Sequence, residues 1–149
     1  MRTQYKYLLL IIWMIIIFLL SNEVAGTSSG RSEAIVNVLT NSLHVSMSEE
    51  ILTFLTRKAA HIVAYFILGL LIYNVMRTCK INTKRTILLS ITIALAYAAF
   101  DEIHQMFVPG RSGEIRDVLI DTTASAVGVY TYYFIHKRRI NGDKSNISI

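Results

Sequence analysis

The chain has 149 residues, of which 53% are hydrophobic and 17% charged, with a single cysteine and a single proline. Soluble domains average roughly 45–50% apolar and 25% charged residues, so this chain is too apolar for that class. One cysteine excludes a disulfide scaffold, and the abundance of Leu, Ile and Val excludes intrinsic disorder. Fifteen Lys and Arg against ten Asp and Glu would fit nucleic-acid binding, unless the positions of those charges have another cause.

The apolar residues are gathered in four blocks rather than scattered at the spacing of a globular core. These blocks predict helices over residues of about 5–22, 57–77, 86–107 and 116–136. A membrane-spanning helix needs about 17–25 residues, so the first and third must include flanking polar residues. We therefore predict a single all-α integral membrane domain over residues 1–149 with four transmembrane helices.

The basic residues are divided unequally between the two ends of these helices. Ten lie at the N-terminus, between the second and third helices, and in the C-terminal tail, whereas five lie in the other two connections. Because basic loops stay in the cytoplasm, we predict a multi-pass protein of the cell membrane with both termini cytoplasmic. Topology thus explains the positive charge, and no nucleic-acid partner is predicted.

The first apolar run has a second interpretation. A basic start and a short apolar stretch also describe a secretory signal peptide, for which Val24-Ala25-Gly26 would be the cleavage site. A retained anchor and a cleaved signal are both open at this point. Cleavage would leave three helices and would change nothing downstream.

The connection between the first two spans is long. Four of its apolar residues recur at helical spacing and predict a short extracytoplasmic amphipathic helix: Ile35, Val38, Leu39 and Leu43. Ser46 and Glu49 then have the spacing of a capping box. Another helix is therefore predicted to begin there and to run into the membrane.

Ionisable residues at membrane depth cost roughly 2.5–3.5 kcal/mol each, so they need partners or a function. Here they form stripes at the extracytoplasmic ends of three helices. The predicted site residues are Arg57, Lys58, His61 and Tyr65 on the second helix, Asp101, Glu102, His104 and Gln105 on the third, Arg111 in the turn containing Pro109, and Asp117 and Asp121 on the fourth. If the stripes face one another, they form one outward-opening polar pocket.

This cluster has a structural and a functional interpretation. In the first, a network of salt bridges joins the helices, and Ser125 and Gly128 allow their close approach. That interpretation suits the residues nearest the surface, which are Arg57, Lys58 and Glu114. The functional interpretation is the default for ionisable residues inside a membrane and suits the deeper residues, which are His61, Asp101, Glu102, His104 and Asp121.

Three chemistries fit such a pocket. A divalent metal would find imidazole and carboxylate ligands in His61, Asp101, His104 and Asp121. Neither HExxH nor paired cysteines accompany them, so no metal or other cofactor is predicted. Acid–base catalysis by Glu102 or a histidine lacks a recognisable nucleophile motif. Binding of an anionic headgroup needs only basic residues near the membrane interface, and these are present.

The same residues carry a family resemblance. The chain closely resembles the VanZ-like family in the run Asp101-Glu102-Ile103-His104-Gln105-Met106-Phe107-Val108-Pro109-Gly110-Arg111, in Arg57-Lys58-Ala59-Ala60-His61 with Tyr65, and in Arg116-Asp117-Val118 with Asp121. The resemblance implies a small bacterial integral membrane protein, in a family named for a member associated with teicoplanin resistance. It marks the motif residues as functional positions and implies no reaction.

We therefore expect a cell-envelope protein whose pocket binds an anionic lipid headgroup or wall precursor, with teicoplanin resistance as a phenotype. One alternative is a metal-dependent membrane hydrolase or transferase that acts on an envelope lipid. The other is a structural or partner-binding helix bundle. Whether the protein is an enzyme stays open, and the lipid bilayer is its one firm expected partner.

Overall fold

The structure is a computed structural model that describes residues 3–22, 49–109, 111 and 113–146. Within these ranges all of the regular secondary structure is helical, as predicted. The elements are α1 (Gln4–Ser21), α3 (Glu49–Met76), the short 3-10 helix η1 (Arg77–Cys79), α4 (Thr83–Gln105) and α5 (Ile115–Asn146).

Two helices lie close to their predicted bounds and two are longer. α3 begins at Glu49 rather than at residue 57, so the helix predicted to start near Glu49 and the second span are one continuous helix. α5 continues to Asn146 instead of ending at 136, so the helix runs through the basic stretch and past Gly142. The amphipathic helix predicted around residues 35–43 lies outside the described residues.

A tight connection makes α3 and α4 antiparallel neighbours. Lys80 ends η1 with a left-handed backbone conformation at φ 53°. Asn82 then caps α4, because its side-chain oxygen accepts a hydrogen bond of 2.8 Å from the Arg85 backbone N–H. The reversal therefore needs only the residues between Met76 and Thr83.

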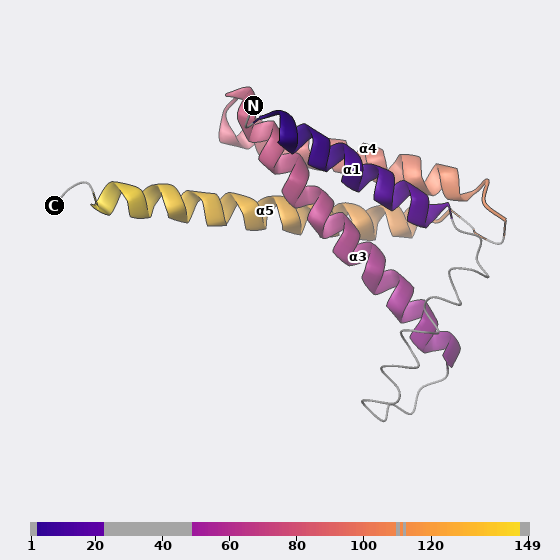
Figure 1. The fold of residues 1–149 in the computed structure, drawn as a ribbon. Coiled ribbons are helices and arrows are strands. Elements are labelled where there is room, and N and C mark those ends of the chain that lie inside the picture. The colour runs from indigo at the N-terminus through magenta and orange to yellow at the C-terminus, as the bar shows by residue number, and fades with distance from the viewer. Residues whose placement is uncertain (1–2, 23–48, 110, 112, 147–149) are drawn as a thin grey trace.

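α3 is the central helix of the bundle. It crosses diagonally and contacts each of the other three long helices (Figure 1). The C-terminal ends of α1 and α4 and the start of α5 lie together at one end, which we call the polar end (Figure 1). The opposite end, which contains η1 and the start of α1, is called the η1 end. The last turns of α5 extend beyond the other helices there (Figure 1).

α3 and α5 cross with their backbones in contact. A Cβ atom added to Gly69 would lie 2.0 Å from the Ser125 carbonyl oxygen, and one added to Gly128 would lie 2.2 Å from the Phe66 carbonyl oxygen. Ser125 also donates a hydrogen bond of 2.8 Å to the Tyr65 carbonyl. The predicted role of Ser125 and Gly128 in close helix approach is confirmed, with Gly69 as the matching residue on α3.

α1 is joined to the bundle by hydrogen bonds as well as by packing. The Trp13 indole N–H donates to the Ala64 carbonyl of α3 at 2.9 Å. The Tyr97 hydroxyl of α4 donates to the Met14 carbonyl at 2.6 Å. Both bonds satisfy polar groups that would otherwise lie in an apolar environment, so they fix where α1 lies against α3 and α4.

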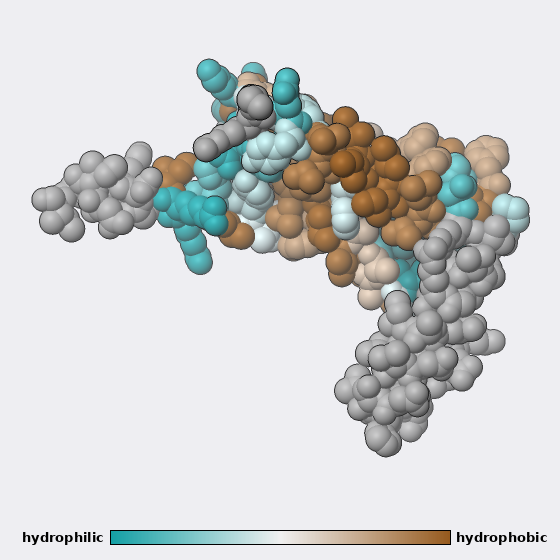
Figure 2. Space-filling view, viewed as in Figure 1, coloured by the Kyte–Doolittle hydropathy of each residue, from teal (hydrophilic) through white to brown (hydrophobic). Residues whose placement is uncertain are grey.

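The surface of the bundle is that of a membrane protein. In the described part of the chain, α1, residues 54–79 and α4 are each long and apolar enough to span a bilayer. Large apolar side chains stay exposed along these helices, among them Leu8, Leu88 and Phe100, and Figure 2 shows apolar residues over the middle of the molecule. Soluble monomers rarely expose such a continuous apolar surface. α5 does not meet these criteria of length and composition.

We expect Gly69→Ala to weaken the crossing of α3 and α5, because the new methyl group would overlap the Ser125 carbonyl. Overpacking of this kind costs about 1–3 kcal/mol of unfolding free energy. Unfolding of the purified protein in detergent would measure the loss. Ala96→Val, which adds bulk on an exposed face of α4, is the control and should change little. Equal stability of both variants would contradict the packing described here.

Candidate functional site

A cavity of about 120 Å³ lies at the polar end between α3, the end of α4 and the start of α5. It brings together most of the predicted site residues, namely Arg57, Lys58 and His61 from α3, Gln105 and Arg111 from α4 and the following turn, and Asp117 and Asp121 from α5. Phe54, Glu114 and Ile120 complete its lining and were not among the predicted site residues. The cavity is therefore mixed in charge, with an apolar side chain on each of α3 and α5.

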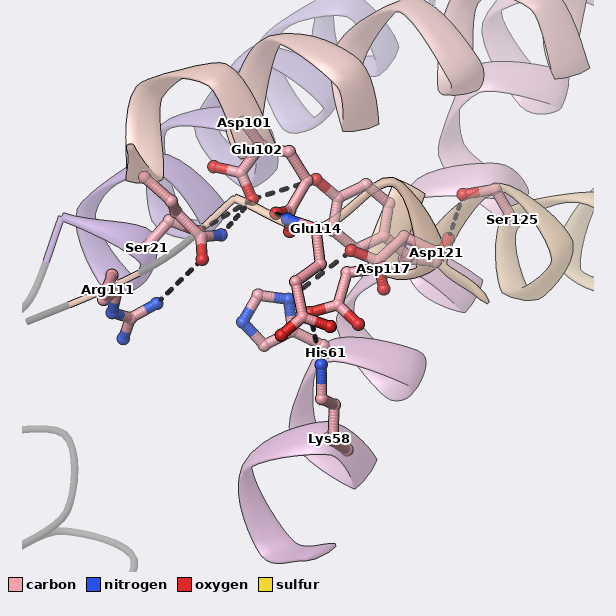
Figure 3. Close-up of polar contacts among 12 residues, drawn as sticks. Ser21, Lys58, His61, Asp101, Glu102, Arg111, Glu114, Asp117, Asp121 and Ser125 are labelled. Atoms are coloured by element: carbon pink, nitrogen blue, oxygen red, sulfur yellow. Dashed lines mark hydrogen bonds and ion pairs between the residues drawn. The ribbon is translucent and has the colours of Figure 1, made fainter. Parts of the chain in front are cut away.

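The acidic side chains of the cavity face basic partners. Lys58 and Asp117 form an ion pair between α3 and α5 (Figure 3). One turn deeper, His61 Nδ1 lies 3.5 Å from Asp121 Oδ2, and the Asp121 side chain is only 3% exposed. The third acidic residue, Glu114, pairs with Arg116 at 2.7 Å on the exposed side. Asp117 and Glu114 thus each pair with a cation, and Asp121 has the His61 imidazole beside it, which is a cation only when protonated.

Arg57 differs from these residues. It lines the cavity, is half-buried, and forms no ion pair with any described residue. Arg111 reaches the cavity from the turn and donates a hydrogen bond of 3.3 Å from Nη1 to Gln105 Oε1. Two guanidinium groups from different elements therefore border the same space. Guanidinium is the side-chain group that best matches the planar oxygen pairs of carboxylate and phosphate.

Asp101 does not line the cavity. It is 1% exposed, and its Oδ2 accepts three hydrogen bonds, from Ser21 Oγ at 2.8 Å, Tyr65 OH at 3.0 Å and Gln105 Nε2 at 3.3 Å (Figure 3). We call these four residues the Asp101 latch. Because its members come from α1, α3 and α4, the latch joins three helices behind the cavity, and Gln105 connects it to Arg111.

Glu102 sets the position of α5. Its Oε2 accepts a hydrogen bond of 2.8 Å from the Glu114 backbone N–H, directly before the first turn of α5. A carboxylate is favourable there because free N–H groups and the helix dipole make a helix start electropositive. Gly113 permits this contact, since an added Cβ would lie 2.6 Å from the Glu102 carbonyl oxygen. Glu102 thereby positions the start of α5, and with it Asp117 and Asp121 in the lining of the cavity.

His104 lies apart from the cavity. Its Nε2 is 3.2 Å from Asn22 Oδ1, and its ring centroid is 4.4 Å from that of Phe18, so it faces α1. The four residues proposed as metal ligands are therefore not brought together, because Asp101 belongs to the latch and only His61 and Asp121 meet. No group of three or more His, Cys, Asp or Glu residues within the described ranges is placed to hold a metal ion.

Sequence reasoning did not pair Ser21 with Asp101. Ser21 is 1% exposed and ends the first apolar run, so its position suggested only the end of a span. The two residues are separated by 80 positions, and no periodicity links them. The one available signal was that both are polar residues at the same predicted end of neighbouring helices.

These features define an all-helical membrane protein whose buried ionisable residues gather at one end of the bundle. The sequence model of the VanZ/LLP1 family matches residues 6–136, which include every predicted site residue. No curated protein and no solved structure matches the chain. The chain belongs to the VanZ/LLP1 family, and the resemblance inferred from its motifs is confirmed.

We expect Asp101→Ala to destabilise the protein, because Ser21, Tyr65 and Gln105 would lose their common acceptor. Leaving buried donors unsatisfied costs about 1–3 kcal/mol each, of which partial relaxation would recover some. Tyr65→Phe removes a single donor and should cost about 1 kcal/mol. Unfolding in detergent measures both. A smaller effect for Asp101→Ala than for Tyr65→Phe would contradict the latch.

Proposed function

We propose that the polar-end cavity binds the anionic group of an envelope lipid or wall precursor. The observation that carries this proposal is the charge state of the lining. Glu114, Asp117 and Asp121 each have a basic partner, whereas Arg57 has no ion pair among the described residues. An incoming phosphate or carboxylate would therefore meet an arginine that forms no ion pair with any described carboxylate, with Arg111 beside it.

We propose that the protein has four membrane spans and that the cavity opens on the extracytoplasmic side. α5 carries Asp117 and Asp121, which lower its hydropathy, but its packing against α3 and α4 covers both side chains in part or in full. The excess of basic residues in the segments of the η1 end supports a cytoplasmic position for that end and for both termini.

We also propose that α1 is a retained anchor rather than a cleaved signal. A signal peptide needs no specific partner in the mature protein. α1, in contrast, donates from Trp13 to α3, accepts from Tyr97 of α4, and supplies Ser21 to the Asp101 latch. Removal of α1 would leave the Tyr97 hydroxyl without its acceptor and Asp101 without one of its donors, which supports retention.

The family is named for a member associated with teicoplanin resistance, and we propose a contribution to such resistance as the phenotype. In a sensitive Gram-positive host, wild-type protein should raise resistance to teicoplanin, with vancomycin tested in parallel. Arg57→Gln should return the host to the susceptibility of an empty-vector strain, at equal membrane abundance by immunoblot.

A soluble probe tests binding directly. Farnesyl diphosphate, which combines an isoprenoid chain with a diphosphate, should bind the purified protein, and Arg57→Gln should weaken this binding about tenfold or more. Arg138→Gln is the control, because Arg138 is exposed and does not line the cavity. Equal loss in both variants would contradict a specific role of the cavity.

One observation favours a second candidate, a membrane hydrolase or transferase acting on the same kind of substrate. His61 lines the cavity and has the buried Asp121 carboxylate beside Nδ1, the arrangement in which a carboxylate orients a histidine for proton transfer. The metal-dependent form of this candidate finds no ligand set in the described ranges. A structural bundle, the third candidate, draws its support from the Asp101 latch.

These candidates differ in what His61→Gln changes. For a hydrolase, wild-type protein would release phosphate from farnesyl diphosphate, and His61→Gln would lower the rate at least tenfold with little change in binding. For a binding protein, no phosphate is released by either form. For a structural bundle, substitutions of both His61 and Arg57 would lower abundance instead. Phosphate release and immunoblot therefore separate the three.

A further inference from the structure

A second cavity lies at the η1 end, on the opposite side of the bundle from the site above. Its volume is about 410 Å³, and it is bordered by the end of α3, the connection through η1, the start of α4 and the later turns of α5. We call it the basic pocket. The lining residues that carry the argument are Arg77, Ile81, Tyr133, His136, Lys137 and Ile140.

None of the described residues that line the basic pocket is acidic. The sequence has no Asp or Glu from residue 51 to 100 or from residue 122 to 142, and the next acidic residue of α5 is Asp143. Arg77 and Lys137 are the Lys and Arg residues of its described lining, and Lys6 of α1 and Arg139 of α5 lie in segments of the same end. The described lining of the basic pocket is therefore positively charged, unlike the mixed lining of the polar-end cavity.

Aromatic rings hold the two cations in place. The Arg77 guanidinium lies over the Tyr132 ring at 5.7 Å and donates to its hydroxyl at 3.3 Å, while that hydroxyl donates to Asn74 Oδ1 at 2.9 Å. Lys137 Nζ lies over the Tyr133 ring at 5.9 Å. A ring face orients a cation without cancelling its charge. Both side chains are therefore positioned, yet neither forms an ion pair with a carboxylate of the described residues.

The rim of the pocket is apolar. Ile81, in the connection between η1 and α4, and Ile140, on α5, line it and stay 37% and 44% exposed. A free phosphate ion would gain nothing from these side chains, whereas the acyl chains of a lipid would bury them. A pocket that has basic residues beside an apolar rim therefore suits a lipid, which has both a charged headgroup and acyl chains, better than a soluble anion.

We propose that the basic pocket binds the phosphate headgroup of an anionic phospholipid, with the acyl chains against Ile81 and Ile140. Basic pockets between membrane helices on the cytoplasmic side are suited to such headgroups. The proposal uses the membrane orientation given above but none of the residues of the polar-end cavity. It therefore adds a lipid site of its own, independent of whether Arg57 binds an envelope ligand.

The test titrates the full-length protein in mild detergent with phosphatidylglycerol or phosphatidylcholine and counts bound lipid by native mass spectrometry. Wild type should prefer phosphatidylglycerol, and the double variant Arg77→Gln, Lys137→Gln should lose about tenfold or more of that affinity. The double variant Lys84→Gln, Arg138→Gln removes the same charge from exposed positions outside the lining and should keep it.

A single variant and a competition with inorganic phosphate distinguish the possible outcomes. Lys137 is exposed, so Lys137→Gln alone should weaken phosphatidylglycerol binding without affecting folding. This single variant tests the pocket even if the double variant fails to fold. Equal loss in the control pair would overturn the pocket in favour of general charge attraction. Displacement of the lipid by inorganic phosphate would overturn the lipid in favour of a soluble anion. Arg57→Gln should leave phosphatidylglycerol binding unchanged while weakening farnesyl diphosphate binding, which separates this proposal from the preceding one.

Discussion

The Asp101 carboxyl group is the interaction on which the polar end depends. In an apolar bundle, a buried carboxyl without partners is costly, and a single oxygen that accepts from three hydroxyl and amide donors offsets much of that cost. Because the donors belong to three helices, satisfying Asp101 also fixes how α1, α3 and α4 lie relative to one another. Gln105 belongs to the latch and also lines the cavity, so the two are directly connected.

The motif residues therefore divide into two groups by what they touch. Asp101, Glu102 and Tyr65 contact other parts of the chain and place helices, whereas Arg57, Lys58 and His61 face the cavity. Gln105 belongs to both, because its amide donates to the latch and its oxygen accepts from Arg111. A substitution in the first group changes stability before it changes binding, so the two groups need different measurements.

The two ends of the bundle handle charge in opposite ways. At the polar end, acidic and basic side chains from α3 and α5 are matched, and Arg57 stands out as the exception. At the η1 end, the described lining of the basic pocket has no acidic residue, and tyrosine rings lie against Arg77 and Lys137. The proposed ligands differ accordingly, an envelope anion near Arg57 at the polar end and a phospholipid headgroup in the basic pocket at the η1 end.

The sequence by itself determined that the protein is helical, that it is apolar enough for a membrane, and which family it belongs to, because hydrophobic blocks and motif residues are local properties of the chain. It also indicated that Ser125 and Gly128 lie at a close helix crossing. It could not show that His104 faces α1 while Asp101 closes a latch with Ser21. Only the tertiary structure decided that, because helical spacing defines which residues share a face, whereas the crossing of α3 against its neighbours decides what each face meets.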